Sequence, residues 1–420
     1  MAHEPALGDN LRRWRRRKGY SQEELAERAG VSVSVVRKLE QDDEAAAQRQ
    51  GVRLESLYKL ARALDAQTAK LFTPRGPEPV DQDPTQHALL PIRVALTPPL
   101  QIAGVAASSE QPTEPDVAVL RSQLDEAVRL YHDDRYEATA LLLPEMIAAA
   151  HATVAYYDHG DEHLEAVRLR SDVLQLAGWF LTQVGASDLA YQAIKDAIAD
   201  ANAVGDPLAA AAGVIGECWL FIRQGRLLDA MKTAVAAADR VEPRLSKASV
   251  AELSAWGWLL LRGWAAAVRN NQEAEALELL RVAQAAAAGV GEETQTGRYH
   301  QYWTTFGPAT VAMKAVEHQV VIGDWRGALA LAERVPPSGR RRSDNRNRHE
   351  LDKAKAHAEL GDSADAVDIL AHLRATSPQW LRHQRMGREV TRTILVSRKR
   401  TLPEQMRELA DFYDIDDIDA

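Results

Sequence analysis

A chain of 420 residues is too long for a single hydrophobic core, so its length predicts two domains or a repeat array. No run of about eighteen apolar residues and no signal-peptide pattern occurs, and Cys218, the one cysteine, excludes an internal disulfide and a cysteine-based zinc site; these features predict a cytoplasmic protein without a membrane span. The net charge of −9 is uneven, because residues 1–75 carry 15 Lys and Arg against 11 Asp and Glu, so a basic end precedes an acidic remainder.

The densest basic stretch, residues 12–18, has the spacing of a helix with one buried stripe. Leu11, Trp14 and the stem of Lys18 recur at helical intervals, which leaves most of the arginines facing outward. Such a basic face is often simply solvated. Beside a DNA-binding motif it would contact phosphates and release counterions, and we assign that role to Arg17.

Residues 19–40 predict two short helices around a tight turn. Ser21 is an N-cap, and Glu24, three residues on, completes a capping box. Gly30 ends the first helix, because glycine adopts a left-handed conformation without a side-chain clash. Ser32 caps the second helix. Its inward positions are Val35, Val36 and Leu39, and its outward positions are Val33, Ser34, Arg37 and Lys38.

This segment resembles the helix-turn-helix of the Cro-like phage-repressor (XRE) family. The residues that carry the resemblance are Gln22, Ala26, the turn at 30–32, Leu39 and Glu40. It implies that the helix from Val33 is a recognition helix, which lies in the major groove of double-stranded DNA. It also implies that Arg15 pairs with Glu40 inside the domain. An ordinary helical hairpin within a bundle is the alternative.

The resemblance and the helix geometry together give the expected DNA contacts besides Arg17. They are Gln22, Ser32, Val33, Ser34, Arg37 and Lys38. Val33 and Ser34 occupy the first turn of the recognition helix, where side chains reach base edges, and Val33 would meet a thymine methyl. Lys38 lies one turn further, within reach of a guanine or a phosphate. The family pattern places Gln22 and Arg37 on the DNA backbone.

Residues 8–72 are expected to form this domain, and residues 73–115 a linker. The connection at 42–51 is longer and more acidic than is usual in the family, which could weaken a backbone contact. Nine prolines fall within 73–115 and predict an extended chain. Residues 88–96 are too apolar for a free tether, so we expect them to lie along the next domain or to pair as a short strand.

From 116 to 412 the chain has a repeating helical pattern, in which a turn residue is followed five positions later by an alanine. The pairs are Asp133/Ala138, Gly185/Ala190, Gly225/Ala230, Asn271/Ala276, Gly323/Ala328 and Gly361/Ala366. The alanine lets two helices approach closely. The pattern resembles tetratricopeptide repeats with lengthened spacing and predicts an all-α chain with a right-handed solenoid of some six helical pairs. An irregular helical bundle is the alternative.

A Cro-like domain followed by such an array resembles a large group of actinobacterial regulators, which implies an effector-binding domain. Aromatic and basic residues alternate on several helices of the array, and aromatic area with arginine suits a peptide or a small anion. The candidate ligand-binding residues are Trp258, Arg262, Tyr299, Tyr302, Trp303, Asn345 and Arg348. Packing between helices is the alternative, and we assign Trp219, Trp264 and Trp325 to it.

No enzyme signature is apparent: the sequence has no phosphate-binding loop, no zinc-protease pair and no serine elbow. His159 and His163 could share a metal on one helix turn, but an exposed acidic helix start is the stronger interpretation. We therefore expect a homodimeric, effector-sensing DNA-binding regulator that has no cofactor, no metal and no catalytic activity. The array, especially its C-terminal residues 378–396, is expected to supply most of the dimer contact. The alternative is a repressor whose array serves only oligomerisation or partner docking.

Overall fold

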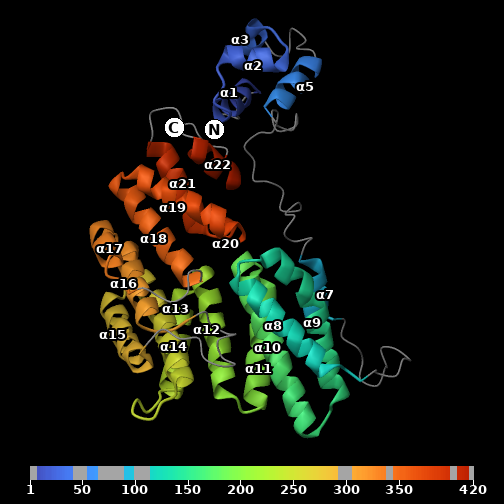
Figure 1. Cartoon of the computed structure of the whole chain (residues 1–420), viewed down its shortest axis with the longest axis vertical. Coiled ribbons are helices and arrows are strands. Elements are labelled where there is room, and N and C mark those ends of the chain that lie inside the picture. The colour runs from blue at the N-terminus through green and yellow to red at the C-terminus, as the bar shows by residue number, and fades with distance from the viewer. Residues whose placement is uncertain are drawn as a thin grey trace. The chain divides into compact units, whose positions relative to one another are not determined.

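The computed structural model describes residues 7–40, 54–64, 89–98, 114–291, 305–336, 344–397 and 404–415 (Figure 1). All regular elements in these ranges are helices, which confirms the predicted all-α fold. The chain divides into two compact units. We call residues 1–83 with 385–420 the terminal unit, and residues 84–384 the central unit.

The terminal unit contains six described helices. They are α1 (Leu7–Arg17), α2 (Gln22–Ala29), α3 (Val33–Glu40), α5 (Leu54–Ala63), α21 (Arg385–Ser397) and α22 (Glu404–Phe412). Helix α1 packs on α3, and α2 packs on α3 and α5, around the fully buried Leu11, Leu25, Val36 and Leu60. The repeat domain was predicted to extend to residue 412, whereas α21 and α22 pack on each other within the terminal unit.

The turn between α2 and α3 follows the local signals in the sequence. The Ser21 hydroxyl accepts a hydrogen bond from the Glu24 N–H at 3.1 Å, and the Glu24 carboxylate accepts one from the Ser21 N–H at 2.7 Å, so the predicted capping box is confirmed. Gly30 is left-handed, with φ 61° and ψ 38°. The Ser32 hydroxyl shares a hydrogen bond with the Ser34 hydroxyl at 2.9 Å, and its role as the cap of α3 stays a prediction.

The central unit begins with a short helix, α7 (Leu90–Leu96), and continues through a series of longer ones. These are α8 (Val117–His132), α9 (Tyr136–Tyr156), α10 (Gly160–Val184), α11 (Ser187–Ala203), α12 (Pro207–Arg223), α13 (Leu227–Arg240), α14 (Val250–Arg269), α15 (Glu273–Val290), α16 (Pro308–Ile322), α17 (Trp325–Ala332), α18 (Asp344–Leu360), α19 (Ser363–Thr376) and α20 (Pro378–Arg382).

These helices form stacked hairpins. Within the described residues six hairpins follow one another, from α8–α9 to α18–α19, and the two helices of each pack together. The first helix of one hairpin also packs on the first helix of the next, as α10 does on α12, α12 on α14, α14 on α16 and α16 on α18 (Figure 1). This regular stacking agrees with the predicted succession of helical pairs; its handedness stays a prediction.

A left-handed residue closes each hairpin, and a buried small residue follows five positions later. Gly185, Gly225, Gly323 and Gly361 have φ between 75° and 87°, and the alanine after each is at most 1% exposed. The first predicted pair, Asp133 with Ala138, is wrong by one position. Asp134 has φ 59°, and Thr139, five residues later, is fully buried against the neighbouring helix.

The first and last hairpins meet through polar contacts, which we call the closing contacts. Asn347 Nδ2 on α18 donates to Asp134 Oδ2 at 3.1 Å, and the Glu137 N–H on α9 donates to Gln379 Oε1 on α20 at 3.0 Å. The partners are 213 and 242 residues apart in the sequence. The central unit therefore joins its two ends within one chain.

The apolar part of the predicted linker lies along the central unit, as expected, but as a helix rather than a strand. Helix α7 packs on α9 and α11, with Ile92 and Leu96 buried and Arg93 paired to Asp188 at 3.0 Å. Contrary to the sequence reading, α9 is long and apolar enough to cross a membrane by length and composition alone. Its packing against α7, α8 and α10 is that of a core helix of the array.

Candidate functional site

A buried ion pair ties α1 to α3. Arg15 Nε donates to Glu40 Oε1 at 2.6 Å and Arg15 Nη2 donates to Glu40 Oε2 at 2.8 Å, so the predicted pair is confirmed. The side chains are 12% and 1% exposed. Burial raises the pKa of Glu40, but hydrogen bonds from Arg15 and Gln22 outweigh it and leave the pKa below its usual value. The pair fixes α3 to α1.

The outer face of α3 presents short polar and basic side chains. Ser32, Ser34, Arg37 and Lys38 are exposed, as predicted for residues that face DNA. Arg37 forms an exposed ion pair with Glu23 on α2 at 2.6 Å, a contact that DNA phosphates could replace. The structure agrees with an accessible helix face; the individual DNA roles stay predictions.

Two residues expected at DNA have other surroundings in the free protein. Val33 was predicted to face outward, but it is half-buried and packs against the core of the terminal unit. Gln22 Nε2 donates to Glu40 Oε2 at 2.7 Å, so its amide nitrogen is already used inside the domain. Arg17 closes α1, but its side chain lies outside the described residues.

The candidate effector residues of the array fall into three groups. Tyr299, Tyr302 and Trp303 lie outside the described residues. Trp258 is 4% exposed and donates its indole N–H to the Thr305 carbonyl oxygen at 3.0 Å. The N–H edge of its indole ring therefore packs inside the array. The third group is described: Arg262 and Arg348 are half-buried, and Asn345 is buried.

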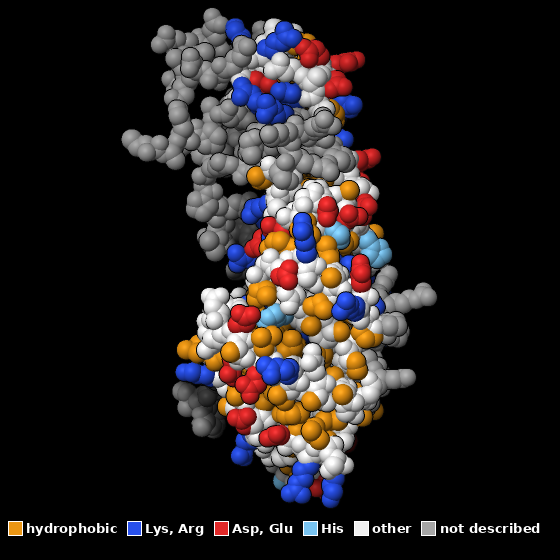
Figure 2. Space-filling model, turned by 90° about the vertical axis from the view of Figure 1, so that its left-hand side faces the viewer, with side chains coloured by type: hydrophobic (Ala, Val, Ile, Leu, Met, Phe, Trp, Pro, Cys, Tyr) orange, Lys and Arg blue, Asp and Glu red, His pale blue; other side chains and the backbone are white. Residues whose placement is uncertain are grey.

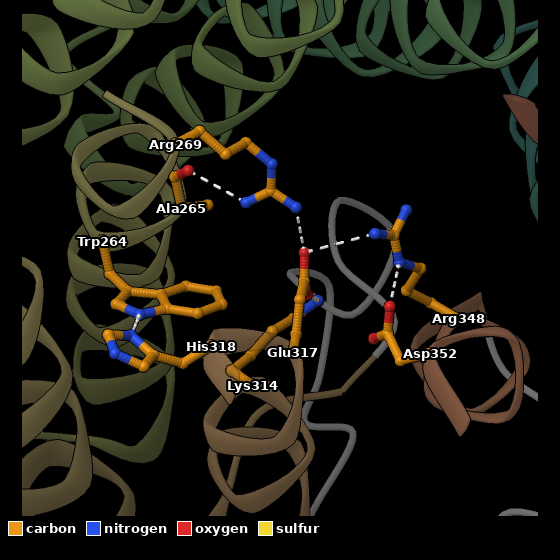
Figure 3. Close-up of polar contacts among 8 residues, drawn as sticks. All are labelled: Trp264, Ala265, Arg269, Lys314, Glu317, His318, Arg348 and Asp352. Carbon is orange, nitrogen blue, oxygen red and sulfur yellow. Dashed lines mark hydrogen bonds and ion pairs between the residues drawn. The ribbon is translucent and has the colours of Figure 1, made fainter. Parts of the chain in front are cut away.

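Arg348 belongs to a cluster of buried charges around Glu317 (Figure 3). Lys314 donates to Glu317 at 2.8 Å, Arg269 donates to the same carboxylate, and Arg348 lies 3.7 Å from it. Burial raises the pKa of Glu317, but these cations outweigh it and leave the pKa well below its usual value. Arg348 also donates to Asp352 at 3.1 Å.

The sequence analysis missed Glu317, although a signal was present. Helix α16 is otherwise largely apolar, and a carboxylate with Lys314 three residues earlier stands out on it. Its 6% exposure requires compensating charge. That charge comes from α14 and α18, and burial raises the pKa of the neighbouring Asp352 to about 6. Trp264, predicted as packing, is fully buried and donates to His318 Nδ1 at 3.2 Å.

A second buried polar group lies at the closing contacts. Asp134 accepts hydrogen bonds from Asn347 at 3.1 Å and from Tyr136 at 3.4 Å. Asp344, at the start of α18, is hydrogen-bonded to Asp134, and burial with this neighbouring carboxylate raises its pKa well above the usual value. Burial and the neighbouring carboxylate therefore favour the protonated form of Asp344, which can donate to Asp134.

The two histidines considered for a metal have simpler contacts. His163 Nδ1 lies 2.6 Å from the Tyr157 carbonyl oxygen, which accepts its proton, and the exposed His159 contacts Asp158. Within the described ranges no cluster of three metal-binding side chains occurs. Cys218 is fully buried, and burial raises the pKa of its thiol to about 12.

Comparison with known proteins agrees with the N-terminal geometry. Residues 11–71 match the helix-turn-helix family. No curated protein matches the chain. The matched segment holds the α2–turn–α3 arrangement, the exposed face of α3 and the Arg15–Glu40 pair. The N-terminal part of the chain is thus a helix-turn-helix domain of the kind found in XRE-like regulators, and the protein is a DNA-binding transcriptional regulator.

Proposed function

We propose that this cytoplasmic regulator reads a specific operator with α3 and that its helical array changes DNA affinity when an effector binds. The observation that supports DNA reading is the exposed polar face of α3 in the matched segment. Selection of bound sequences from a randomised duplex pool tests it. One enriched motif is the expected outcome, and equal binding of all sequences would contradict specific reading.

We also propose a homodimer, because one domain of this size makes a small DNA interface and two copies read half-sites about one helical turn apart. The stretch expected to supply the dimer contact, residues 378–396, needs correction. Trp380, Leu381, Val390 and Ile394 are at most 2% exposed within the single chain, so they offer no open apolar face.

Other surfaces are better suited to the dimer contact. Leu90 and Val94 on α7 and Leu141 on α9 are 52%, 60% and 79% exposed, on two helices that pack together. On the face shown in Figure 2, apolar side chains are broken up by charges of both signs. Light scattering of the full chain at micromolar concentration tests the dimer. A Leu141→Glu variant should be monomeric if this surface makes the contact.

Effector sensing is supported by Arg223 and Arg262 of the array, which pair with no carboxylate among the described residues. We propose that the array has no catalytic activity and needs no cofactor. The alternative, an array that only oligomerises or docks a protein, is distinguished by thermal unfolding of the full chain with cell extract fractionated to small molecules. A ligand that binds the folded state raises the melting temperature by mass action. No shift with any fraction would favour the alternative.

A further inference from the structure

One half-buried arginine in the central unit has no carboxylate partner among the described residues. The guanidinium carbon of Arg262 on α14 lies 5.1 Å from the ring centre of Trp258 and 5.7 Å from that of Trp219 on α12. Its Nε is buried without a hydrogen-bond partner, and no described carboxylate pairs with the guanidinium. Burial lowers the pKa of Arg262 to about 10, as expected for a cation held away from water.

Three other half-buried arginines of the array are compensated by carboxylates. Arg170 donates twice to Asp200, at 2.7 and 2.8 Å, and Arg269 and Arg348 face Glu317. A buried charge without a partner costs free energy, so proteins usually pair it. Arg262 differs from these three arginines, and its guanidinium lies beside two indole rings.

A second arginine shares one of these rings. Arg223, one turn after Trp219 on α12, has its guanidinium carbon 5.7 Å from the Trp219 ring centre. It donates to the carbonyl oxygens of Gln183 at 3.3 Å and His383 at 3.5 Å, both long for charged donors. Arg223 is exposed, yet the surrounding protein lowers its pKa. Arg223 therefore has access to solvent although the protein around it desolvates its guanidinium.

An unpaired polar donor lies near these two arginines, and a neighbouring ring supports Trp219. Tyr131 on α8 is 1% exposed, its hydroxyl has no hydrogen-bond partner, and it lies within electrostatic range of Arg223 and Arg262. Trp219 is half-buried and meets the buried Trp179 edge to face, with ring centres 6.2 Å apart. This edge-to-face contact helps to fix the plane of the Trp219 ring.

We propose that Trp219, Arg223 and Arg262 form a binding site for a small organic acid with a flat ring, such as an aromatic carboxylate or phosphate ester. The ring stacks on Trp219, and the oxyanion accepts hydrogen bonds from the two guanidiniums. The site rests on the proposed effector role of the array and names the chemistry of the effector. It also revises the assignment of Trp219 to packing alone.

The test is calorimetric titration of the full chain with benzoate and with phenyl phosphate, each at constant ionic strength. Benzamide, which has the same ring without the charge, is the matched neutral probe. We expect at least one acid to bind and benzamide to bind on the order of tenfold more weakly or not at all, because charged hydrogen bonds account for differences of this size. The preferred acid distinguishes a carboxylate from a phosphate effector. Equal binding of benzamide, or no binding of either acid, overturns the proposal.

The decisive variant is Arg262→Gln, with Arg121→Gln as control. Arg121 is an exposed arginine on α8 paired with Glu165, so the control makes the same charge change away from the site. Arg262→Gln should weaken acid binding on the order of tenfold or more, and the control should bind like wild type. Without ligand, Arg262→Gln should melt no lower than wild type, since it removes an unpaired cation. A lower melting temperature with unchanged acid binding would make Arg262 a structural residue.

Acid binding and regulation can fail separately. DNA affinity for the selected operator is measured with and without the acid that binds. If the acid binds through Arg262 and operator affinity does not change, the site stands and the effector role is wrong. If the chain binds no specific operator, the proposed function fails whatever the calorimetry shows.

Discussion

Replacing Arg15 with alanine should loosen the N-terminal helices without directly affecting DNA recognition. Arg15 makes two hydrogen bonds to Glu40 and a third, at 2.9 Å, to the Tyr20 carbonyl oxygen. Without it, a carboxylate that is 1% exposed keeps the Gln22 amide as a hydrogen-bond donor and Arg12 as a nearby positive charge, but loses its paired cation. Leaving one member of such a pair uncompensated costs on the order of 3–5 kcal/mol, a large share of the about 5–15 kcal/mol that stabilises a typical domain.

The assay is amide hydrogen exchange of the full chain, read on peptides from residues 7–40. Arg15→Ala should raise the exchange rate of α2 and α3 by a factor on the order of 100 or more, as the lost free energy implies. Arg37→Ala is the matched control, because the Arg37–Glu23 pair is 57% and 58% exposed and should contribute little. Wild-type protection in Arg15→Ala, with a loss only of salt-dependent DNA affinity, would refute the structural assignment.

The pH dependence of the same variant gives an independent check. The folded-state pKa of Glu40 is lowered, so its contribution to stability is present above the unfolded-state pKa and is lost as pH falls through the folded value. In Arg15→Ala the burial that raises this pKa remains, and the main opposing hydrogen bonds are gone. The difference in protection between wild type and variant should therefore shrink as pH falls below about 4.5, the ordinary value for glutamate.

Three further predictions concern packing, titration and DNA reading. A methyl group at Gly257 would lie 1.9 Å from the ring of the fully buried Phe306, so Gly257→Ala should destabilise the central unit by at least about 1–3 kcal/mol. Thermal unfolding measures this loss. Gly263→Ala is the control and should cost less, because the nearest atom to its added methyl group is 3.2 Å away. Burial and the neighbouring Asp134 raise the pKa of Asp344, so the stability that its protonated form contributes is present below the ordinary value of 3.8 and is lost as pH rises through the folded-state pKa. The melting temperature of Asp344→Asn relative to wild type should therefore increase as pH rises above 3.8, and a pH-independent difference would contradict this. Lys38→Ala should weaken operator binding by about 1–3 kcal/mol and relax the base preference at one operator position. Arg17→Ala should weaken binding to all sequences alike and reduce the slope of log affinity against log salt concentration by about one. An unchanged base preference in Lys38→Ala would show that Lys38 contacts only phosphate.

The sequence predicted the terminal helices well because their determinants are local. The capping box and the left-handed Gly30 each act within a few residues, and the Arg15–Glu40 pair follows from the family resemblance. Val33 was misjudged, although a strict helical count would have corrected it. Val36 and Glu40 are three and seven positions after Val33 and both are buried, which puts Val33 on the same stripe.

The helical repeats of the array could be predicted from the sequence, but its buried charge clusters could not. Turn residues and small residues five positions apart mark each hairpin, and the error at Asp134 arose because two adjacent aspartates offer the same turn signal. Glu317, by contrast, takes its charge partners from positions 48 residues before it, on α14, and 31 after it, on α18. Local periodicity carries no information on such partners, so buried charge networks require the tertiary structure.

The location of Arg223 links the proposed acid site to the closing contacts. Its guanidinium lies at the Trp219 ring and also donates to the backbone of His383, which follows α20, the helix that carries the closing residue Gln379. At 3.5 Å that hydrogen bond is weak, so an oxyanion could displace it at little cost. A ligand can shift a conformational equilibrium only through different affinities for its two states. An acid bound at Arg223 satisfies this requirement if it competes with the His383 contact. Hydrogen exchange at residues 379–383 should then rise when the acid binds, and unchanged exchange there would separate the acid site from the closure of the array.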